Sequence, residues 1–369
     1  MIVLCLKLGS ARLFVRCVLV LLLASLLTAQ SALAVGSWTK LTASTPSNAP
    51  VQLMLLLPDG TVMAAGSNIT NTWYKLTPDT NGSYVNGKWS TLHSMTSTRL
   101  YYASVVLRDG RVFVAGAEYG TGRATAEIYN PLTDVWTTLT VPTNVLDPTK
   151  AWSGGTNKQA FLDSGAVLLA DGRVLIEPVF PQNSYDTVIY DPVGNTWSSG
   201  PTARAGDQDE ASWIKLPDES ILTVDQGSTT AERYLPVGYL TNHVPTIASN
   251  RWIADTNVPI SLYDSIGSEI GPGMLLANGT AFLVGANGNS AIYTPSGDNT
   301  QGSWQIGPAL PNVVKYPLDN NGNELTNSAV STAGAAPDAP AASLVNGQVL
   351  YAFSAPLYND PRAGTTPAG

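Results

Sequence analysis

The sequence predicts an all-β protein, a β-propeller built from four-stranded antiparallel blades. Three observations support this prediction: a hairpin pattern recurs along the chain, each of the first five hairpins is followed by a strand that ends near a proline, and a tryptophan then opens a further strand. One such sheet alone leaves both of its faces uncovered, whereas sheets stacked around an axis cover each other's faces. The repetition of the unit therefore predicts the fold.

The first 34 residues have the features of a cleaved signal peptide. The basic residues Lys7, Arg12 and Arg16 precede the apolar segment Val18–Leu27, and Ala32-Leu33-Ala34 provides a small-residue cleavage pattern. The apolar segment is shorter than the roughly 20 residues of a membrane span. We expect residues 1–34 to be removed, the propeller to occupy residues 35–369, and the mature protein to be secreted, extracellular or periplasmic, without a membrane anchor.

Charge and cysteine content narrow the class of protein. After removal of the leader, the chain has 16 basic and 27 acidic residues, a net charge of −11. Nucleic acids and anionic membranes require basic patches, so neither is expected as a partner. Both cysteines, Cys5 and Cys17, lie in the leader. The mature protein therefore has no disulfide, and its stability must come from a large apolar core.

Each hairpin pattern consists of two short apolar runs on either side of a turn. The clearest copy has Ala103–Leu107 and Val112–Ala115 around Asp109-Gly110. An Asp-Gly pair in this position predicts a two-residue turn in which both residues have positive φ. The six turns are Asp59-Gly60, Asp109-Gly110, Asp171-Gly172, Asp218-Glu219, Asn278-Gly279 and Asn346-Gly347.

A third strand and a tryptophan follow each of the first five hairpins. The third strands end near Pro78, Pro131, Pro192, Pro236 and Pro295, and the fourth begin near Trp89, Trp136, Trp197, Trp252 and Trp304. Adjacent tryptophans of this set are 47 to 61 residues apart, which is close to the roughly 50 residues of one blade repeat. The tryptophans are expected in the core. The blades are expected at about 50–89, 100–136, 161–197, 209–252 and 269–304.

The two ends of the repeat series are incomplete. Residues 339–354 supply only the hairpin of a sixth blade, and residues 355–369 show no further strand pattern. Near the other end, Trp38 opens a strand that no hairpin precedes, and we expect this strand to close the last blade. Either the last blade is incomplete or the chain is a fragment of a longer propeller with six or seven blades; we favour the fragment. Residues 141–159 and 312–337 are expected to be long loops.

The repeats resemble kelch repeats, most closely those of the galactose oxidase-like propeller. The matching segments are Ala103–Gly116, Ile128–Pro131 and Trp136. The resemblance covers the mature chain at the level of the repeat and implies the fold more specifically than an activity. Copper oxidases of that family use a tyrosine cross-linked to cysteine, a second tyrosine and two histidines. The mature chain has no cysteine and only two histidines, His93 and His243, in expected outer connections. We therefore do not expect this protein to catalyse the copper-radical reaction.

One face of such a propeller is expected to bind a ligand. The loops that lead into each innermost strand, and those that join second to third strands, gather there, and we call it the funnel face. Arg99 resembles the arginine that the oxidases use to hold substrate, and Tyr101 and Tyr102 occupy positions where those enzymes place a histidine. The predicted binding residues are Arg99, Tyr101, Tyr102, Glu118, Asp163, Asp209, Glu210 and Glu269. The same loops carry Asn48, Gln52, Tyr119, Glu177, Asp207, Asp225, Gln226 and Asp338.

Three interpretations of these residues stay open. Carboxylates accept hydrogen bonds from hydroxyl groups and aromatic rings stack on sugars, which suits a carbohydrate. A ring of oxygen ligands would instead suit Ca²⁺. The same carboxylates could also cap backbone amides of the next blade and serve the structure alone.

We expect a monomeric binding or scaffold module for a carbohydrate or an extracellular protein, without a bound cofactor. The alternative is an enzyme that acts on carbohydrate at the funnel face. It would be either a divergent oxidase relative without the copper site or a glycoside-active enzyme, which needs two carboxyl groups about 5–9 Å apart. A third hypothesis is a purely structural surface protein.

Overall fold

The computed structural model describes residues 37–203, 208–209, 211–237, 240–241, 244–245, 250–265, 268–315, 330–337 and 339–354. The predicted signal peptide, Asp207, Glu210, His243, Asp338 and residues 355–369 lie outside these ranges. Contacts divide the chain into residues 1–42 and residues 43–369. The described residues form strands, turns and one short 3-10 segment, Pro46–Asn48. None of their helices is long and apolar enough to cross a membrane.

The described part of residues 43–369 contains five four-stranded sheets, each an antiparallel meander. The first comprises β1 (Val51–Leu56), β2 (Val62–Gly66), β3 (Trp73–Thr77) and β4 (Lys88–Thr91). The second comprises β6 (Ala103–Val106), β7 (Val112–Ala115), β9 (Ala126–Asn130) and β10 (Val135–Leu139). The third comprises β11 (Gly165–Leu168), β12 (Val174–Glu177), β13 (Val188–Asp191) and β14 (Thr196–Ser199).

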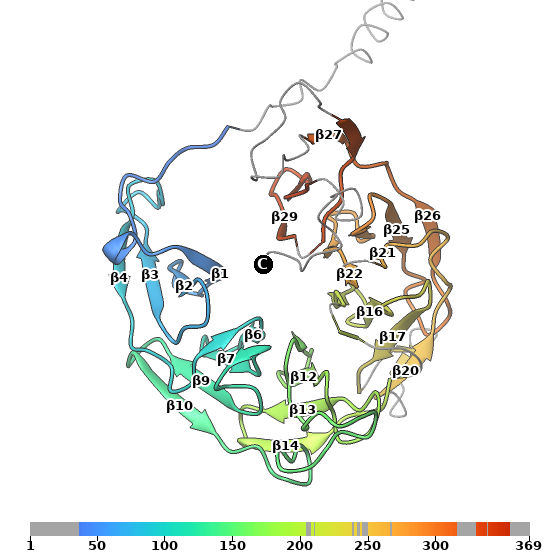
Figure 1. The fold of residues 1–369 in the computed structure, drawn as a ribbon, viewed down its shortest axis with the longest axis horizontal. Coiled ribbons are helices and arrows are strands. Elements are labelled where there is room, and N and C mark those ends of the chain that lie inside the picture. Colours follow the sequence, from blue (N-terminus) through green and yellow to red (C-terminus); the bar gives the residue numbers. More distant parts are fainter. Residues whose placement is uncertain are drawn as a thin grey trace, which may run out of the picture. The chain divides into compact units, whose positions relative to one another are not determined.

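The fourth and fifth sheets repeat this order. The fourth comprises β15 (Ile214–Lys215), β16 (Ile221–Val224), β17 (Ala231–Leu235) and β20 (Arg251–Ala254). The fifth comprises β23 (Gly273–Leu275), β24 (Ala281–Val284), β25 (Ser290–Thr294) and β26 (Ser303–Ile306). The hairpin β29 (Ala341–Ser343) and β30 (Val349–Tyr351) follows. The sheets succeed one another in sequence order, with the fourth strands outermost (Figure 1). This confirms the predicted all-β propeller.

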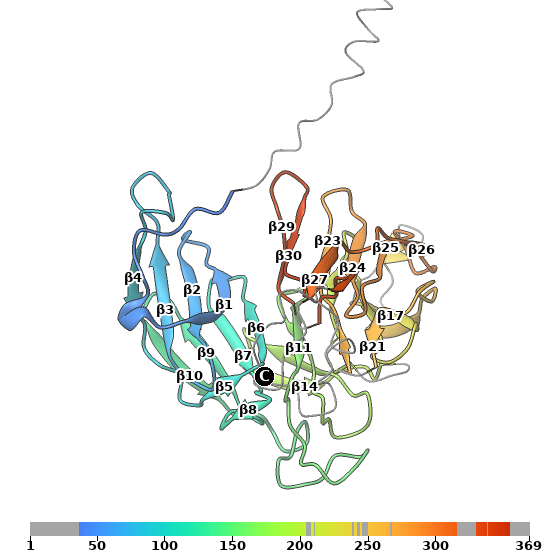
Figure 2. The same ribbon diagram turned by 45° about the horizontal axis from the view of Figure 1, so that its top comes forward.

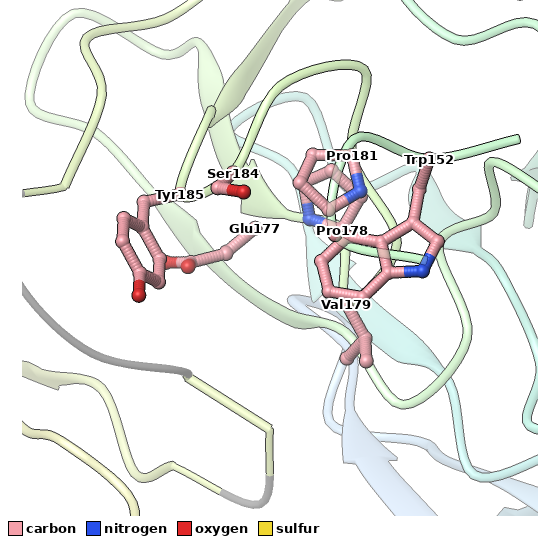
Figure 3. A pocket seen from close by; sticks show the side chains of 8 residues that line it. Trp152, Glu177, Pro178, Val179, Pro181, Ser184 and Tyr185 are labelled. Carbon is pink, nitrogen blue, oxygen red and sulfur yellow. The ribbon is translucent and has the colours of Figure 1, made fainter. Parts of the chain in front are cut away.

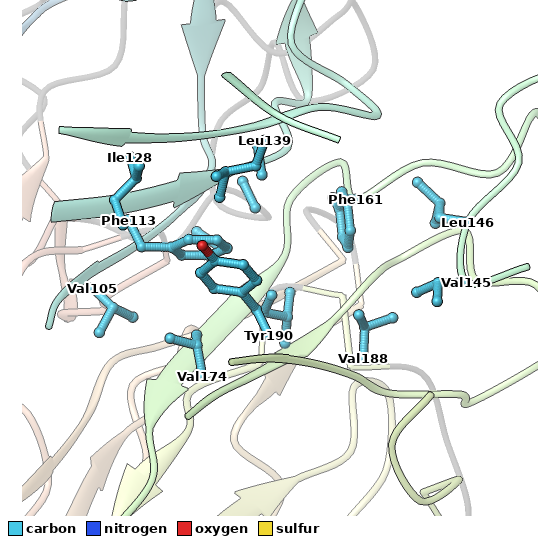
Figure 4. Close-up of a cluster of buried hydrophobic side chains, with 14 of the residues drawn as sticks. Val105, Phe113, Ile128, Leu139, Val145, Leu146, Phe161, Val174, Val188 and Tyr190 are labelled. Atoms are coloured by element: carbon cyan, nitrogen blue, oxygen red, sulfur yellow. The ribbon is translucent and has the colours of Figure 1, made fainter. Parts of the chain in front are cut away.

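Apolar clusters hold consecutive sheets together. The cluster between the second and third blades combines Phe113 and Ile128 with Val174 and Tyr190 (Figure 4). The Phe113 and Tyr190 rings stack with centroids 5.1 Å apart. Four further clusters of this kind are formed by the residues that the structure describes. Each blade therefore obtains its core from its neighbour, as the repeat predicts.

The six hairpin turns share one geometry, which differs from the predicted one. In every copy the Asp or Asn side-chain oxygen accepts a hydrogen bond from the backbone N–H two residues later, at 2.9 to 3.1 Å. Only the residue after it has positive φ, between 68° and 92°; it is glycine in five copies and Glu219 in the fourth. The expectation that both turn residues have positive φ is wrong. The loop is one residue longer, so that a single left-handed residue closes it as a bulge.

The tryptophan register also repeats from blade to blade. Four of the fourth-strand tryptophans pair across the strands with Tyr129, Tyr190, Tyr234 and Tyr293. The ring centroids of these four pairs are 4.7 to 5.6 Å apart. Trp252 is buried, and the tryptophans of the other four blades are half-buried because the fourth strand is outermost. Trp38 lies outside any strand and is 87% exposed; its closing of the last blade stays a prediction.

One predicted loop contains strands. Within residues 312–337, β27 (Asn312–Lys315) and β28 (Val330–Ala333) form an antiparallel pair. Composition suggested a loop, but the β-branched residues at its two ends favour a strand pair. The described residues form three further two-stranded sheets in the connections between the longer strands. They are β5 (Arg99–Leu100) with β8 (Tyr119–Gly120), β18 (Leu240–Thr241) with β19 (Val244–Pro245), and β21 (Tyr263–Asp264) with β22 (Glu269–Ile270).

Candidate functional site

The funnel face of the second blade carries an exposed pair of tyrosines. The β5–β8 pair lies at the lower end of this blade in Figure 2. Tyr101 follows β5, and Tyr119 belongs to β8; each is 49% exposed. Their rings meet edge to face, with centroids 6.3 Å apart. Two amphipathic rings are thereby presented to solvent at one place.

Tyr101 holds a strained backbone conformation. Its φ is +50°, a left-handed value that costs a residue with a side chain about 1–2 kcal/mol. The carbonyl groups of Leu100 and Tyr101 both accept a hydrogen bond from the Glu118 N–H, at 3.0 Å each. The surrounding strand pair therefore imposes the conformation, which is how strain persists at functional positions.

Two carboxylates accompany the tyrosines. The pKa of Tyr119 is raised, chiefly by its hydrogen bond with Glu118 and by the charge of that residue, with smaller effects of Tyr101 and Asp163. Glu118 and Asp163 are both half-buried. Tyr101, Glu118, Tyr119 and Asp163 thus form one group, which we call the tyrosine rim. Sequence analysis predicted three of these as binding residues and placed Tyr119 on the same loops.

Arg99 has a different role from the predicted one. Its side chain is fully buried and forms an ion pair with buried Glu127 at 2.9 Å. Its Nη1 also donates to the carbonyl oxygens of Gly116 and Gly122, at 2.6 and 2.9 Å. A guanidinium enclosed by protein acceptors cannot hold a ligand at the surface, so the predicted substrate contact of Arg99 is corrected to a structural one. It ties the loops that carry the rim to the second blade.

Tyr102 and the later carboxylates lie apart from this group. Tyr102 is half-buried and packs against the apolar cluster between the first two blades; burial raises its pKa. Asp209 precedes the fourth blade, and Glu269 lies in β22, opposite Asp264. Glu210 lies outside the described residues. The predicted set therefore spans several blades, and the contacts above unite only part of it.

A buried acidic pair lies in the fourth blade, where Asp225 and Glu232 are each 1% exposed. Gln208 donates to Asp225 at 2.7 Å and accepts from Thr223 at 2.6 Å. Burial, then the charge of Glu232 and a hydrogen bond with it, raise the pKa of Asp225 from 3.8 to about 8. The Asp225–Glu232 pair therefore holds a proton at neutral pH that an isolated carboxyl group would have released. Sequence analysis placed Asp225 on a funnel loop but missed Glu232, whose signal was an acidic residue inside a third strand.

A small pocket lies beside the third blade and has a volume of about 230 Å³. It is lined by Trp152, Gly154, Glu177, Pro178, Val179, Pro181, Ser184 and Tyr185 (Figure 3). Glu177 ends β12, and most of the remaining lining belongs to the connection from β12 to β13. Trp152 comes from the long segment 141–159. Sequence analysis placed Glu177 on the funnel face and did not anticipate this pocket.

No three His, Cys, Asp or Glu side chains come close enough to hold a metal ion in the part of the chain that the structure describes. His93 lies beyond the fourth strand of the first blade, where its ring pairs with Asp134 at 2.9 Å. Its expected position outside the funnel face agrees with this placement. The calcium alternative stays a prediction.

Comparisons with known proteins give no family: no family matches the chain, and no curated protein matches it. Similar solved structures include YjhT, with 13% identity over 79% of this chain and 94% of that one and a TM-score of 0.48. A fungal alcohol oxidase of the AA5 family, in complex with copper, has 15% identity over 87% of this chain and 77% of that one, with a TM-score of 0.48.

Virginiamycin B lyase from Staphylococcus aureus is a third similar structure, with 10% identity over 81% of this chain and 82% of that one and a TM-score of 0.46. Similarity at this level carries no argument about activity. The fold assignment rests on the sheet order and the clusters between blades, and the kelch-repeat assignment stays a prediction.

Proposed function

We propose that this protein is a secreted propeller that binds carbohydrate at the tyrosine rim. The observation that carries the proposal is the exposed Tyr101–Tyr119 pair beside the carboxylates of Glu118 and Asp163. Aromatic rings stack on the apolar faces of sugars, and carboxylates accept hydrogen bonds from sugar hydroxyl groups. The rim offers both within one group of side chains.

The rim is also organised before a ligand arrives. The hydrogen bond between Tyr119 and Glu118 restrains the Tyr119 ring, and the β5–β8 pairing restrains the backbone of Tyr101. A binding surface that is already ordered loses less conformational entropy on association. The strain at Tyr101 supports the same proposal, because strained residues that the surrounding structure holds in place cluster at binding and catalytic sites.

The enzyme alternative has less support. Asp225, whose pKa is raised, and its neighbour Glu232 are almost completely buried. A general acid must come within hydrogen-bond reach of its substrate, and the burial of this pair does not provide that access. The absence of cysteine from the mature chain argues against a cross-linked copper cofactor.

A glycan array followed by calorimetry tests the binding proposal. We expect the secreted protein to bind a defined set of sugars. Tyr119→Ala and Glu118→Gln should each weaken that binding about fivefold to thirtyfold, since one aromatic or charged contact is worth about 1–2 kcal/mol. The control is His93→Ala, which removes a side chain outside the funnel face and should leave the affinity unchanged. A silent array, or unchanged affinity in both rim variants, would contradict the proposal.

Secretion is tested separately by expressing the full chain in a host with an export pathway. We expect the exported protein to begin at Val35 when its N-terminus is sequenced, because cleavage should follow Ala34. Retention of the leader in a membrane fraction would contradict this part of the proposal without affecting the binding experiment.

A further inference from the structure

We propose that the pocket between Trp152 and Tyr185 is a second binding site, which takes an alkylammonium group. It lies outside the tyrosine rim and involves a different chemistry from sugar binding. The pocket, at about 230 Å³, is smaller than the roughly 300–1,000 Å³ typical of sites for drug-sized ligands. Its size therefore suits one small group, either free or at the end of a side chain.

The Trp152 wall is fixed by contacts within the described residues. The indole ring packs against Phe180 with centroids 5.2 Å apart. Phe180 in turn exchanges two backbone hydrogen bonds with Ala160, at 2.9 and 3.2 Å. A Cβ at Gly154 would overlap the indole ring, so that only glycine lets the chain pass over it. The ring thus has a defined position before any ligand binds.

Tyr185 forms the opposite wall of the pocket, and its backbone is left-handed like that of Tyr101 in the tyrosine rim. Tyr185 is 40% exposed and has a φ of +64°. The carboxylate of Asp186 accepts hydrogen bonds from Asn183 and Thr202, at 2.7 and 2.8 Å, and the Ala203 N–H donates to the Tyr185 carbonyl at 2.8 Å. These contacts impose the left-handed conformation that presents the ring, and a bulky residue in that conformation is a reason to look for function.

Glu177 supplies the charge. Its side chain extends toward Tyr185, and Trp152 lies on the other side of the pocket next to Pro178 (Figure 3). Glu177 is 5% exposed, and it is the charged residue among those that line the pocket. A cation placed over aromatic faces is attracted by their electron-rich rings, and a carboxylate adds to this attraction.

The remaining lining disfavours other ligand classes. It contains prolines, a valine and Ser184. The hydroxyl groups of Ser184 and Ser153 form a hydrogen bond of 3.0 Å with each other. An anion would require basic side chains, and a neutral sugar would require several polar partners. The net charge of −11 for the mature chain further favours the approach of a cation.

Titration calorimetry of the full chain with choline tests the proposal, with the neutral isostere 3,3-dimethylbutanol as the matched probe. We expect choline to bind about fivefold to thirtyfold more tightly than the isostere, because cation–π attraction in a partly desolvated site is worth about 1–2 kcal/mol. Glu177→Gln and Trp152→Ala should each weaken choline binding by a similar factor. Equal affinity for choline and for the isostere would overturn the proposal. So would a failure of both choline and the lysine probe Nα-acetyl-lysine amide to bind.

Two further variants separate binding from folding. Tyr185→Gly removes a ring where the backbone already favours glycine, so we expect weaker choline binding with an undiminished melting temperature. Tyr119→Ala, at the tyrosine rim, should leave choline binding unchanged, which makes this site independent of the proposed sugar site. An unchanged affinity of Tyr185→Gly for choline would contradict the proposal that choline binds in this pocket.

The source of the ammonium group is distinguished by a second titration with Nα-acetyl-lysine amide. Binding of the lysine probe with the same dependence on Glu177 indicates a lysine side chain of a partner protein. Binding of choline alone indicates a free quaternary ammonium compound. Both outcomes support an alkylammonium site.

Discussion

Two exposed tyrosines, Tyr101 and Tyr185, have backbone φ values of +50° and +64°. Each lies in one of the two proposed sites, and hydrogen bonds from neighbouring segments hold each in place. A left-handed conformation is unfavourable for tyrosine. At these two positions the fold therefore holds a residue under strain and presents its aromatic ring to solvent.

Replacement of Tyr101 by glycine and by alanine separates strain from recognition. We expect Tyr101→Gly to be more stable than Tyr101→Ala by about 1 kcal/mol, because only glycine adopts the left-handed region without cost. Both variants should lose sugar binding. Urea denaturation measures the stability and calorimetry measures the sugar binding. An alanine variant at least as stable as the glycine variant would contradict the claim that the Tyr101 backbone is strained.

The pKa of Asp225, raised to about 8, predicts how stability depends on pH. Between about pH 4 and pH 8 the unfolded chain loses this proton while the folded chain keeps it, so the stability contribution of the protonated carboxyl is lost as pH rises through that range. We expect the melting temperature of Asp225→Asn to fall less than that of the wild type between pH 4 and pH 8. At pH 7 the melting temperature of the variant should be higher than that of the wild type.

The matching variant is Glu232→Gln, which removes the neighbouring charge that contributes to the raised pKa. It should also reduce the pH dependence, while the exposed-face variant His93→Ala should not change it between pH 7 and 8. A melting temperature with the same pH profile in the wild type and in Asp225→Asn would show that Asp225 ionises normally.

Arg99 shows what a residue pattern cannot reveal. Its position before the innermost strand of the second blade suggested contact with a ligand, but the partner that decides its role is Glu127, 28 residues later in the third strand. A buried ion pair requires both partners, since a single buried charge is costly. The acidic residue in an otherwise apolar strand, Ala126–Tyr129, was the available signal.

At the scale of the element, the hairpin turn is the most regular feature of the chain. Its left-handed position is Gly110 in the second blade, with φ +85°, and Glu219 in the fourth, with φ +68°. The Asp or Asn before it accepts the same backbone hydrogen bond in every copy. The turn type was mispredicted because Asp-Gly occurs in both short and longer hairpin loops.

The turn predicts opposite effects of two substitutions. Glu219→Gly should raise the free energy of unfolding by up to about 1 kcal/mol, because the left-handed strain disappears and the exposed ion pair with Lys215 is worth little. Gly110→Ala should lower it by about 1 kcal/mol for the converse reason. Chemical denaturation measures both, and a destabilised Glu219→Gly would contradict the argument.

At the scale of the whole propeller, stability lies between blades. Phe113 is fully buried and contacts Tyr190 and Trp197 of the next blade, with centroids 5.1 and 6.0 Å away. Phe113→Ala should reduce the free energy of unfolding by about 3–5 kcal/mol through lost burial and a cavity. Leu132→Ala, at a site 93% exposed, is the control. A small loss in Phe113→Ala, comparable to the control, would show that the blades are stabilised separately.

The class of fold could be predicted from the amino-acid sequence, because periodic features are local. Apolar alternation, Asp-Gly turns and a tryptophan in each fourth strand predict a meander wherever they occur, and their repetition requires neighbouring sheets to cover one another. The same reasoning identified most of the tyrosine rim, since Tyr101, Glu118, Tyr119 and Asp163 lie on loops whose side of the propeller follows from strand order.

Which of these residues are exposed, by contrast, depends on contacts between segments that are distant in the sequence. Arg99 is enclosed by segments up to 28 residues away, and the pocket joins Trp152 to the connection around Tyr185, two segments that share no sequence pattern. Burial and contact depend on which distant segments meet, and no local pattern records that. The sequence therefore predicted the propeller, and the packing of its loops decided which of the candidate side chains are exposed.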